Sequence, residues 1–253
     1  GKRIPFGGQE YEVEELTDTC MDGKDLDFAL FSAGGSTSLK FAPLFAEKGI
    51  YVIDNSSAWR MDPDVPLIVP EVNASELYRM QGKIIANPNC STIQAMVAIK
   101  PIQEMFGLKR VIYSTYQAVS GAGMGGYNDL LNGIEGKAPE KFAYPIFANV
   151  LPQIDVFQED GYTKEEQKMI DESRKILGLP DLRVTATTVR VPVYYGHSES
   201  INIETIKPFE LKQIYAFLED APGIKIVDNP KENEYPMPLF IADTDEVYVG
   251  RIR

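Results

Sequence analysis

A cysteine at the start of a predicted helix is the residue of this chain best placed to do chemistry. In KIIANPNCSTIQAM, Cys90 follows an apolar run over residues 84–86 and precedes a helical pattern whose apolar face holds Ile93, Met96 and Val97. The free N–H groups and partial positive charge of a helix N-terminus stabilise a thiolate, which lowers a cysteine pKa from about 8.5 to about 3.5–7.5. The pattern therefore predicts a nucleophile, with a small buried hydrophobic side chain as the alternative.

The only histidine of the chain offers a proton acceptor for such a thiol. His197 stands in RVPVYYGHSES, seven residues after Arg190. In one extended strand an odd spacing puts two side chains on opposite faces, so we expect a bulge at Gly196 to redirect His197. A purely structural role for the histidine is the alternative.

Two glycine-rich stretches follow strand-like segments and are candidates for binding a ligand. SAGGST, residues 32–37, precedes a helical pattern, so its backbone N–H groups are placed to approach an anion, although a plain tight turn explains it equally well. TYQAVSGAGMGG, residues 115–126, contains four glycines and is either a flexible loop or a surface that a ligand approaches closely. The residues of interest are Ser32, Ala33, Gly34, Gly35, Ser120 and Gly121.

Three charged residues have ordinary explanations when each is taken alone. Arg60 ends the stretch DNSSAWR, and an isolated arginine is usually solvated. In TKEEQK, Glu165 and Lys168 are spaced i, i+3 on a predicted helix. We interpret that pair as a weak surface ion pair.

The elements that must position these residues begin with a βαβ unit. Residues 28–31 are an apolar run typical of a core strand, a helical pattern follows, and IYVIDNSSAW supplies a second strand. Strand, helix and strand within about 30 residues predict a parallel sheet with right-handed crossovers. We expect Ser36 to cap that helix and Gly49 to end it.

The pattern changes after Cys90. Residues 110–120 and 182–206 are rich in Val, Ile, Thr and Tyr, which favours long antiparallel strands over short parallel ones. We predict an α/β chain with a partial doubly wound, Rossmann-like domain over residues 1–89. An α+β domain with a largely antiparallel or mixed sheet follows over residues 90–253.

Composition narrows the class of protein. The 253 residues are 44% hydrophobic and carry a net charge of −12, which disfavours nucleic acid and anionic membrane as partners. No apolar run reaches the roughly 18 residues of a membrane span. Two cysteines and one histidine disfavour a disulfide framework and a metal site and indicate a reducing, cytoplasmic location.

Four motifs, taken together and in this order, resemble one family. SAGGSTS, NPNCSTIQ, TYQAVSGAG and RVPVYYGHSES are similar to stretches of the aspartate-β-semialdehyde dehydrogenase family, and the likeness extends from GKRIPF to VYVGRIR. By this resemblance Cys90 is the nucleophile, His197 the acid/base, and Gln117 a residue that places the substrate. Further residues implied to contact the substrate are Arg190 for its carboxylate, Glu165 for its amino group, Lys168 and Arg60 for phosphate, and Asn89.

The resemblance implies a phosphorylating oxidoreductase of lysine, threonine and methionine biosynthesis. It interconverts L-aspartyl-4-phosphate and L-aspartate-4-semialdehyde through a cysteine thioester, with NADP as cofactor and no metal. Ser32 to Gly35, Ser120 and Gly121 are implied to bind the cofactor. A homodimer or homotetramer is expected.

The chain departs from the family pattern at both ends. The N-terminal glycine fingerprint and the C-terminal helix of the family are missing, so we expect an internal piece of a longer protein. Two other enzymes with similar chemistry are alternatives: an N-acetylglutamyl-phosphate reductase and a cofactor-free Cys/His thiol acyltransferase. A non-enzymatic alternative is a dimerisation module formed by residues 90–253.

Overall fold

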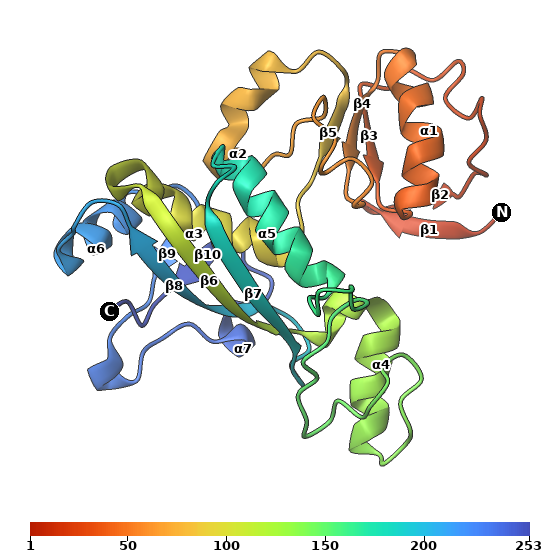
Figure 1. The fold of residues 1–253 in the computed structure, drawn as a ribbon. Helices are drawn as coiled ribbons and strands as arrows, with labels where there is room; N and C mark the ends of the chain where they lie inside the picture. Colours follow the sequence, from red (N-terminus) through yellow and green to blue (C-terminus); the bar gives the residue numbers. More distant parts are fainter. The chain divides into compact units, whose positions relative to one another are not determined.

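A computed structural model describes residues 1–253, which divide into two compact units. The first comprises Gly1–Pro66 and Glu76–Asn87, and the second comprises Leu67–Ser75 and Pro88–Arg253. Figure 1 shows their elements in chain order. Each unit has its own sheets, so each is described separately.

The first unit is built on a three-stranded parallel sheet. Strands β3 (Phe28–Phe31), β4 (Tyr51–Asp54) and β5 (Ile84–Ala86) lie in that order, and helix α1 (Gly35–Glu47) connects the first two (Figure 1). This confirms the predicted βαβ unit. A short antiparallel hairpin, β1 (Arg3–Phe6) with β2 (Gln9–Glu12), precedes it.

Glycines mark both ends of α1, and only one of them was expected there. Gly34, with a φ of 87°, is the residue before the helix, and no side chain caps it. The prediction that Ser36 caps the helix is therefore wrong, because Ser36 already lies inside the first turn. At the other end Gly49 follows the C-cap Lys48 with a φ of 86°, a conformation that favours glycine.

The core of this unit lies between α1 and one face of the sheet. Val52 is fully buried there, and Ala29 and Phe31 of β3 pack against the same cluster. The neighbouring residues Phe28 and Leu30 are 63% and 79% exposed, so only alternate residues of the predicted core strand belong to the core. Successive side chains of a strand point to opposite faces, and α1 covers only one of them.

The second unit contains a three-stranded mixed sheet in the order β7–β6–β8 (Figure 1). The strands are β6 (Leu108–Gln117), β7 (Arg183–Arg190) and β8 (Ser198–Thr205). β8 pairs antiparallel with β6, whereas β7 pairs parallel to it. The preference for antiparallel strands therefore holds for one neighbour only, because the helix-containing connection from β6 to β7 returns the chain in the same direction.

Two helices cover the inner face of that sheet and carry three of the candidate residues, Cys90, Glu165 and Lys168. Helix α3 (Cys90–Phe106) packs against β6, β8 and helix α5 (Lys164–Leu177), and α5 also packs on β7. Tyr113, Met96 and Met169 are fully buried between these layers. The mixed sheet covered by helices, together with the parallel sheet of the first unit, confirms the predicted α/β fold class.

Shorter elements complete the chain. They are α2 (Pro70–Asn73), η1 (Ala74–Arg79), η2 (Val119–Ala122), α4 (Gly123–Ile134), α6 (Leu211–Glu219), β9 (Ile224–Ile226), η3 (Pro230–Glu232), α7 (Pro238–Ile241) and β10 (Val247–Val249). β9 and β10 pair parallel and lie near α6 and α3. No helix combines the length and apolarity that crossing a membrane requires.

Candidate active site

Cys90 is the first residue of α3. The residue before it, Asn89, is the N-cap: its Oδ1 accepts hydrogen bonds from the backbone N–H groups of Ser91 at 3.0 Å and Thr92 at 3.3 Å. Such capping fixes where a helix begins. The strand-to-helix corner read from the sequence is therefore present, and the Cys90 side chain is accessible to solvent.

The thiol of Cys90 is nevertheless harder to ionise than the sequence suggests. Protein atoms packed around the sulfur raise the pKa of Cys90 above its usual value, and the Glu165 carboxylate raises it further. The Ser91 N–H and the Arg190 guanidinium act in the opposite direction and are outweighed. The prediction of a lowered pKa is wrong because burial of the sulfur, and then the Glu165 carboxylate, outweigh the effect of the helix N-terminus.

His197 lies in the segment that joins β7 to β8. β7 ends at Arg190 and β8 begins at Ser198, so the two residues are not in one strand and Gly196, with a φ of 81°, forms part of a turn. The predicted bulge within a continuous strand is therefore wrong. The chain reversal brings the two side chains together without it.

The imidazole of His197 is held in one tautomer. The backbone N–H of Ala118 donates to Nδ1 at 3.0 Å, so Nδ1 is an acceptor and the ring proton is on Nε2. Burial, and then the charge of Arg190, lower the pKa of His197 to about 4. At neutral pH His197 is therefore uncharged and presents an N–H donor.

The same residue, Ala118, also holds Arg190. Nη1 of Arg190 donates to the Ala118 carbonyl at 2.7 Å, and the arginine is 5% exposed. Gly121 lies against both side chains: a Cβ at that position would be 2.9 Å from Arg190 Nη1 and 3.1 Å from His197 Nε2. The glycine of this loop is therefore required for close packing around the imidazole and the guanidinium.

Glu165 is a buried carboxylate, not half of a surface ion pair. It lies in the first turn of α5 and is 6% exposed. Its Oε1 accepts hydrogen bonds from Asn89 Nδ2 at 2.9 Å and Gln117 Nε2 at 3.1 Å, and its Oε2 is 3.2 Å from Lys168 Nζ. Burial alone would raise the pKa of Glu165, but these partners outweigh burial and lower it, so Glu165 is ionised.

Lys168 is shared between two carboxylates. Besides Glu165, its Nζ contacts Asp155 Oδ2 at 2.9 Å. Burial lowers the pKa of Lys168, but the two acidic neighbours raise it by more than burial lowers it. The pKa therefore lies above its usual value, and the ammonium stays charged. A ligand anion at this site therefore competes with Asp155 for Lys168.

Three acidic or hydroxyl residues in or next to α5 were missed by sequence reasoning. Thr163 and Glu166 form a capping box at the start of α5, and Glu166 also accepts a hydrogen bond from the Thr188 N–H of β7 at 2.9 Å. Glu172 accepts the Asn89 N–H at 2.6 Å. The pattern T-x-x-E in TKEE is a recognisable sign of a capping box. The seven-residue spacing of Glu165 and Glu172 places both on the helix face that meets α3.

One further predicted residue of the second unit, Ser120, lies in the loop that begins at Ala118. Ser120 is half-buried, and its backbone N–H donates to the Tyr194 carbonyl at 3.2 Å. Hydrogen bonds, close contacts and electrostatic interactions thus link eight of the predicted residues: Cys90, Asn89, Gln117, Gly121, Glu165, Lys168, Arg190 and His197.

The first unit contains the other predicted residues. Ser32, Ala33 and Gly34 are exposed, and Gly34 immediately precedes the thirteen-residue helix α1. The first N–H groups of a helix have no intrahelical acceptor, no side chain caps this one, and no atom lies within 4 Å of a Cβ built on Gly34. This open helix N-terminus fits a phosphate group of a dinucleotide.

Arg60 is 8% exposed, so its interpretation as a solvated arginine is wrong. Its Nη2 donates to the Asn55 carbonyl at 3.1 Å within the first unit. No group of three or more His, Cys, Asp or Glu residues in the structure could hold a metal ion.

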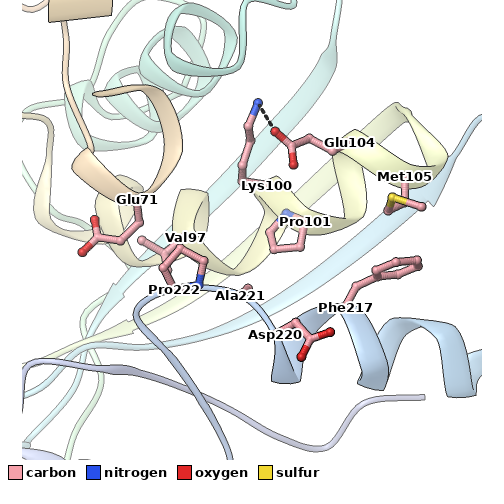
Figure 2. A pocket seen from close by; sticks show the side chains of 10 residues that line it. All are labelled: Glu71, Val97, Lys100, Pro101, Glu104, Met105, Phe217, Asp220, Ala221 and Pro222. Atoms are coloured by element: carbon pink, nitrogen blue, oxygen red, sulfur yellow. Dashed lines mark ion pairs between the residues drawn. The ribbon is translucent and has the colours of Figure 1, made fainter. Parts of the chain in front are cut away.

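A separate pocket of the second unit contains none of these residues. Figure 2 shows it between α3, from Val97 to Met105, and the chain from Phe217 to Pro222. It is lined by three carboxylates and by Lys100, whose Nζ is 3.2 Å from Glu104. It has neither a nucleophile nor an imidazole, so the candidate active site is the group around Cys90.

An accessible cysteine at a helix N-terminus, with an imidazole, an arginine and a buried carboxylate nearby, is an arrangement typical of thiol-dependent enzymes. The first unit, a parallel α/β fold with an open helix N-terminus, has a site of the kind that binds the phosphate of a nucleotide. Together these features fit the class of thiol-dependent dehydrogenases.

Comparison with known proteins gives the family. The profile described as "Semialdehyde dehydrogenase, NAD binding domain" matches residues 1–80, and "Semialdehyde dehydrogenase, dimerisation domain" matches residues 99–253. The aspartate-semialdehyde dehydrogenases of Aquifex aeolicus and Bacillus subtilis are 55% and 46% identical, each aligned over 100% of this chain and 76% of its own length.

Solved structures agree. Aspartate semialdehyde dehydrogenase II from Vibrio cholerae is 43% identical with a TM-score of 0.89, over 100% of this chain and 76% of that one. A second structure of that protein, described as complexed with ASA, is 42% identical with the same TM-score and the same coverage of the two chains.

The chain therefore belongs to the aspartate-semialdehyde dehydrogenase family. Its function is that of an aspartate-semialdehyde dehydrogenase, an oxidoreductase of amino-acid biosynthesis that uses a nicotinamide cofactor. Neither the N-acetylglutamyl-phosphate reductase nor the cofactor-free thiol acyltransferase alternative is supported by these relatives.

Proposed function

We propose that the enzyme is phosphorylating and NADP-dependent, and that Cys90 carries the acyl group as a thioester between L-aspartate-4-semialdehyde and L-aspartyl-4-phosphate. The observation that carries the proposal is the position of Cys90 at the start of α3, where it interacts electrostatically with both Glu165 and Arg190. These two groups match the ammonium and the carboxylate of an amino-acid substrate.

In the oxidative direction the Cys90 sulfur adds to the aldehyde carbon and forms a hemithioacetal. Loss of hydride from that carbon leaves a thioester, and attack by inorganic phosphate releases aspartyl phosphate and returns the thiolate. The bound NADP⁺ supplies the hydride acceptor. In its proposed role as the acid/base, His197 donates a hydrogen bond from Nε2 to the substrate oxygen, which takes up the thiol proton when the sulfur adds and loses it when the hydride leaves.

Substrate recognition rests on opposite charges. The Arg190 guanidinium binds the α-carboxylate with two parallel hydrogen bonds, and the ionised Glu165 binds the α-ammonium. Gln117 and Asn89 both donate to Glu165 Oε1, so they orient that carboxylate as well as facing the substrate. Lys168 and Arg60 are proposed to contact phosphate.

The cofactor is proposed to bind through the first unit and the Ala118 loop. The N–H groups at the start of α1, in the segment Ser32 to Gly35, hold a phosphate of the dinucleotide, and Ser120 and Gly121 also contact the cofactor. Residues 1–89 then form the cofactor-binding domain, and residues 90–253 the catalytic and dimerisation domain. A cytoplasmic homodimer or homotetramer is proposed, which light scattering tests by excluding a monomer.

Trapping the intermediate tests the proposal. Enzyme incubated with aspartate semialdehyde and NADP⁺ without phosphate is quenched and digested, and mass spectrometry should place an aspartyl thioester on Cys90 and none on Cys20. NADPH formation beyond one equivalent per active site should depend on phosphate, and it should be faster than NADH formation from NAD⁺. An adduct on another residue, or turnover without phosphate, contradicts the proposed mechanism, and Cys90→Ala provides the matched control.

A further inference from the structure

Gln94 connects the helix that carries Cys90 to the strand that follows His197. It lies four residues after Cys90 on α3, hence on the same face one turn later. Its Nε2 donates to Glu199 Oε1 at 2.7 Å and also lies 3.4 Å from the backbone carbonyl of His197. The side-chain amide of Gln94 therefore links α3, the helix that begins with Cys90, to both His197 and Glu199.

Glu199 is a half-buried acid whose carboxyl end is buried with an incomplete set of partners. It is the second residue of β8, pairs with Thr115 of β6 and lies on the inner face of the sheet, below α3. Its Oε2 is buried without a hydrogen-bond partner, and no lysine, arginine or histidine forms an ion pair with the side chain. An ionised carboxylate in such surroundings is costly, whereas a neutral carboxylic acid is tolerated.

Burial leaves Glu199 neutral at physiological pH, and Tyr113, Cys90 and His197 add no charge beside it. Burial raises the pKa of Glu199 to about 8, and the hydrogen bond from Gln94 only partly opposes this. On β6, Tyr113 has a pKa raised by burial, with Glu199 adding to the shift, so it carries no charge. On α3, the raised pKa of Cys90 favours the neutral thiol. On the His197 side the imidazole is uncharged.

We propose that Gln94 and Glu199 form a clamp that positions His197 against Cys90, and that the clamp works only while Glu199 is a neutral carboxylic acid. The inference rests on the proposed roles of Cys90 and His197, and Glu199 is a positioning residue that does not touch the substrate. When Glu199 loses its proton, the new charge attracts water and both N–H groups of the Gln94 amide. The contact between Gln94 and the His197 carbonyl is then lost.

The test compares Glu199→Gln with wild type and with Glu204→Gln. The amide introduced by E199Q keeps an acceptor for Gln94 and has the shape of the neutral acid, but it cannot ionise. Glu204 is an exposed residue of the same strand and serves as the control. Above pH 8, kcat of wild type and of E204Q should fall about tenfold per pH unit, as expected for a single ionisation, and kcat of E199Q should not.

A second measurement does not depend on turnover. The infrared band of a protonated carboxyl group should disappear from the wild-type spectrum between pH 7 and pH 9, and this change should be absent in E199Q. Gln94→Met, which removes the donor and keeps the length of the side chain, should lower kcat about tenfold or more with little change in KM. Urea unfolding confirms that each variant is folded.

The outcomes separate the clamp from the proposed function. If E199Q retains the alkaline fall of wild type, or if the infrared titration is absent, the clamp is wrong whatever Cys90 does. If the infrared titration is present but Q94M changes only KM, Glu199 is neutral without positioning His197, and the proposal fails. If no thioester forms on Cys90, the function fails while the infrared result still reports on Glu199.

Discussion

Asn89 donates a hydrogen bond from its side-chain nitrogen to Glu165 at 2.9 Å, while its side-chain oxygen caps the helix that begins with Cys90. One side chain therefore sets both the position of the nucleophile and the orientation of the carboxylate proposed to bind the substrate ammonium. Because Glu172 also accepts the Asn89 N–H at 2.6 Å, the residue is fixed from two sides by α5. The two functions of Asn89 can be separated by substitution.

Asn89→Ala should lose both functions, and Asn89→Asp should lose one. Alanine removes the cap, which costs about 1 kcal/mol of stability, and it also removes the donor to Glu165. Aspartate still caps the helix but places a second carboxylate against Glu165. Urea unfolding should therefore show a loss of stability that is larger in N89A, and steady-state kinetics should show a raised KM for the semialdehyde in both. Equal stability of N89A and wild type would contradict the capping function.

Gly121→Ala should impair the site although the substitution adds only one methyl group. Its Cβ would lie 2.9 Å from Arg190 Nη1 and 3.1 Å from His197 Nε2, so the guanidinium and the imidazole must move. We expect kcat/KM to fall about a hundredfold, the scale of a displacement of about 1 Å in an active site. Gly82→Ala is the control, because no atom lies within 4 Å of its Cβ. Matching kinetics for the two variants would show that the close packing is irrelevant.

Arg190→Lys should raise KM far more than it lowers kcat. The ammonium of lysine cannot form the paired hydrogen bonds that a guanidinium makes with a carboxylate. The lysine side chain is also too short to keep the 2.7 Å contact with the Ala118 carbonyl. Arg183→Lys, an exposed position in the same strand, should leave the kinetics unchanged. An unaltered KM for aspartate semialdehyde in R190K would remove Arg190 from the binding site.

Glu165→Gln should make Cys90 easier to ionise. The Glu165 carboxylate raises the pKa of the thiol, so a neutral amide at this position should lower that pKa and move the alkylation profile to lower pH. The rate of carboxamidomethylation by iodoacetamide, measured peptide by peptide, reports the thiolate fraction. Cys20 provides an internal reference whose profile should not move. An unchanged midpoint for Cys90 would show that Glu165 has no electrostatic effect on the nucleophile.

The residues predicted correctly are those whose position depends on neighbouring sequence. The helix beginning at Cys90 follows from the spacing of its apolar residues, and the end of α1 at Gly49 follows from the glycine that the left-handed conformation requires. Their roles in the site came from the resemblance of four motifs to one family. Neither source requires knowledge of the packing.

The features predicted wrongly depend on contacts between distant parts of the chain. Glu165 has the spacing of a surface pair with Lys168, but α5 packs its first turn against Asn89 and Gln117, which buries the carboxylate. Burial of the sulfur, together with the same carboxylate, reverses the expected pKa shift of Cys90. For His197, a turn between β7 and β8 replaces the predicted bulge, because the direction of β8 is set by its pairing with β6.

The stability of the protein should depend on pH through Glu199 with a sign opposite to that of an ordinary salt-bridged acid. Its pKa is raised from 4.5 to about 8 in the folded state, so the folded state holds a proton that the unfolded state releases. The stabilisation is therefore complete below about pH 4.5 and decreases up to about pH 8, by roughly 1.4 kcal/mol per pH unit.

Urea unfolding of wild type and E199Q between pH 5 and pH 9 measures this dependence. The free energy of unfolding of wild type should decrease relative to that of E199Q as pH rises to about 8 and should then run parallel to it. E204Q is the control of opposite sign, because hydrogen bonding to Lys109, followed by its charge and that of Arg183, lowers the pKa of Glu204. The stabilisation from Glu204 is therefore already complete above about pH 4.5, and the E204Q curve should run parallel to wild type. Wild-type and E199Q curves that stay parallel over the whole range would mean that Glu199 is already ionised in the folded protein, and the neutral clamp beneath His197 would then have no physical basis.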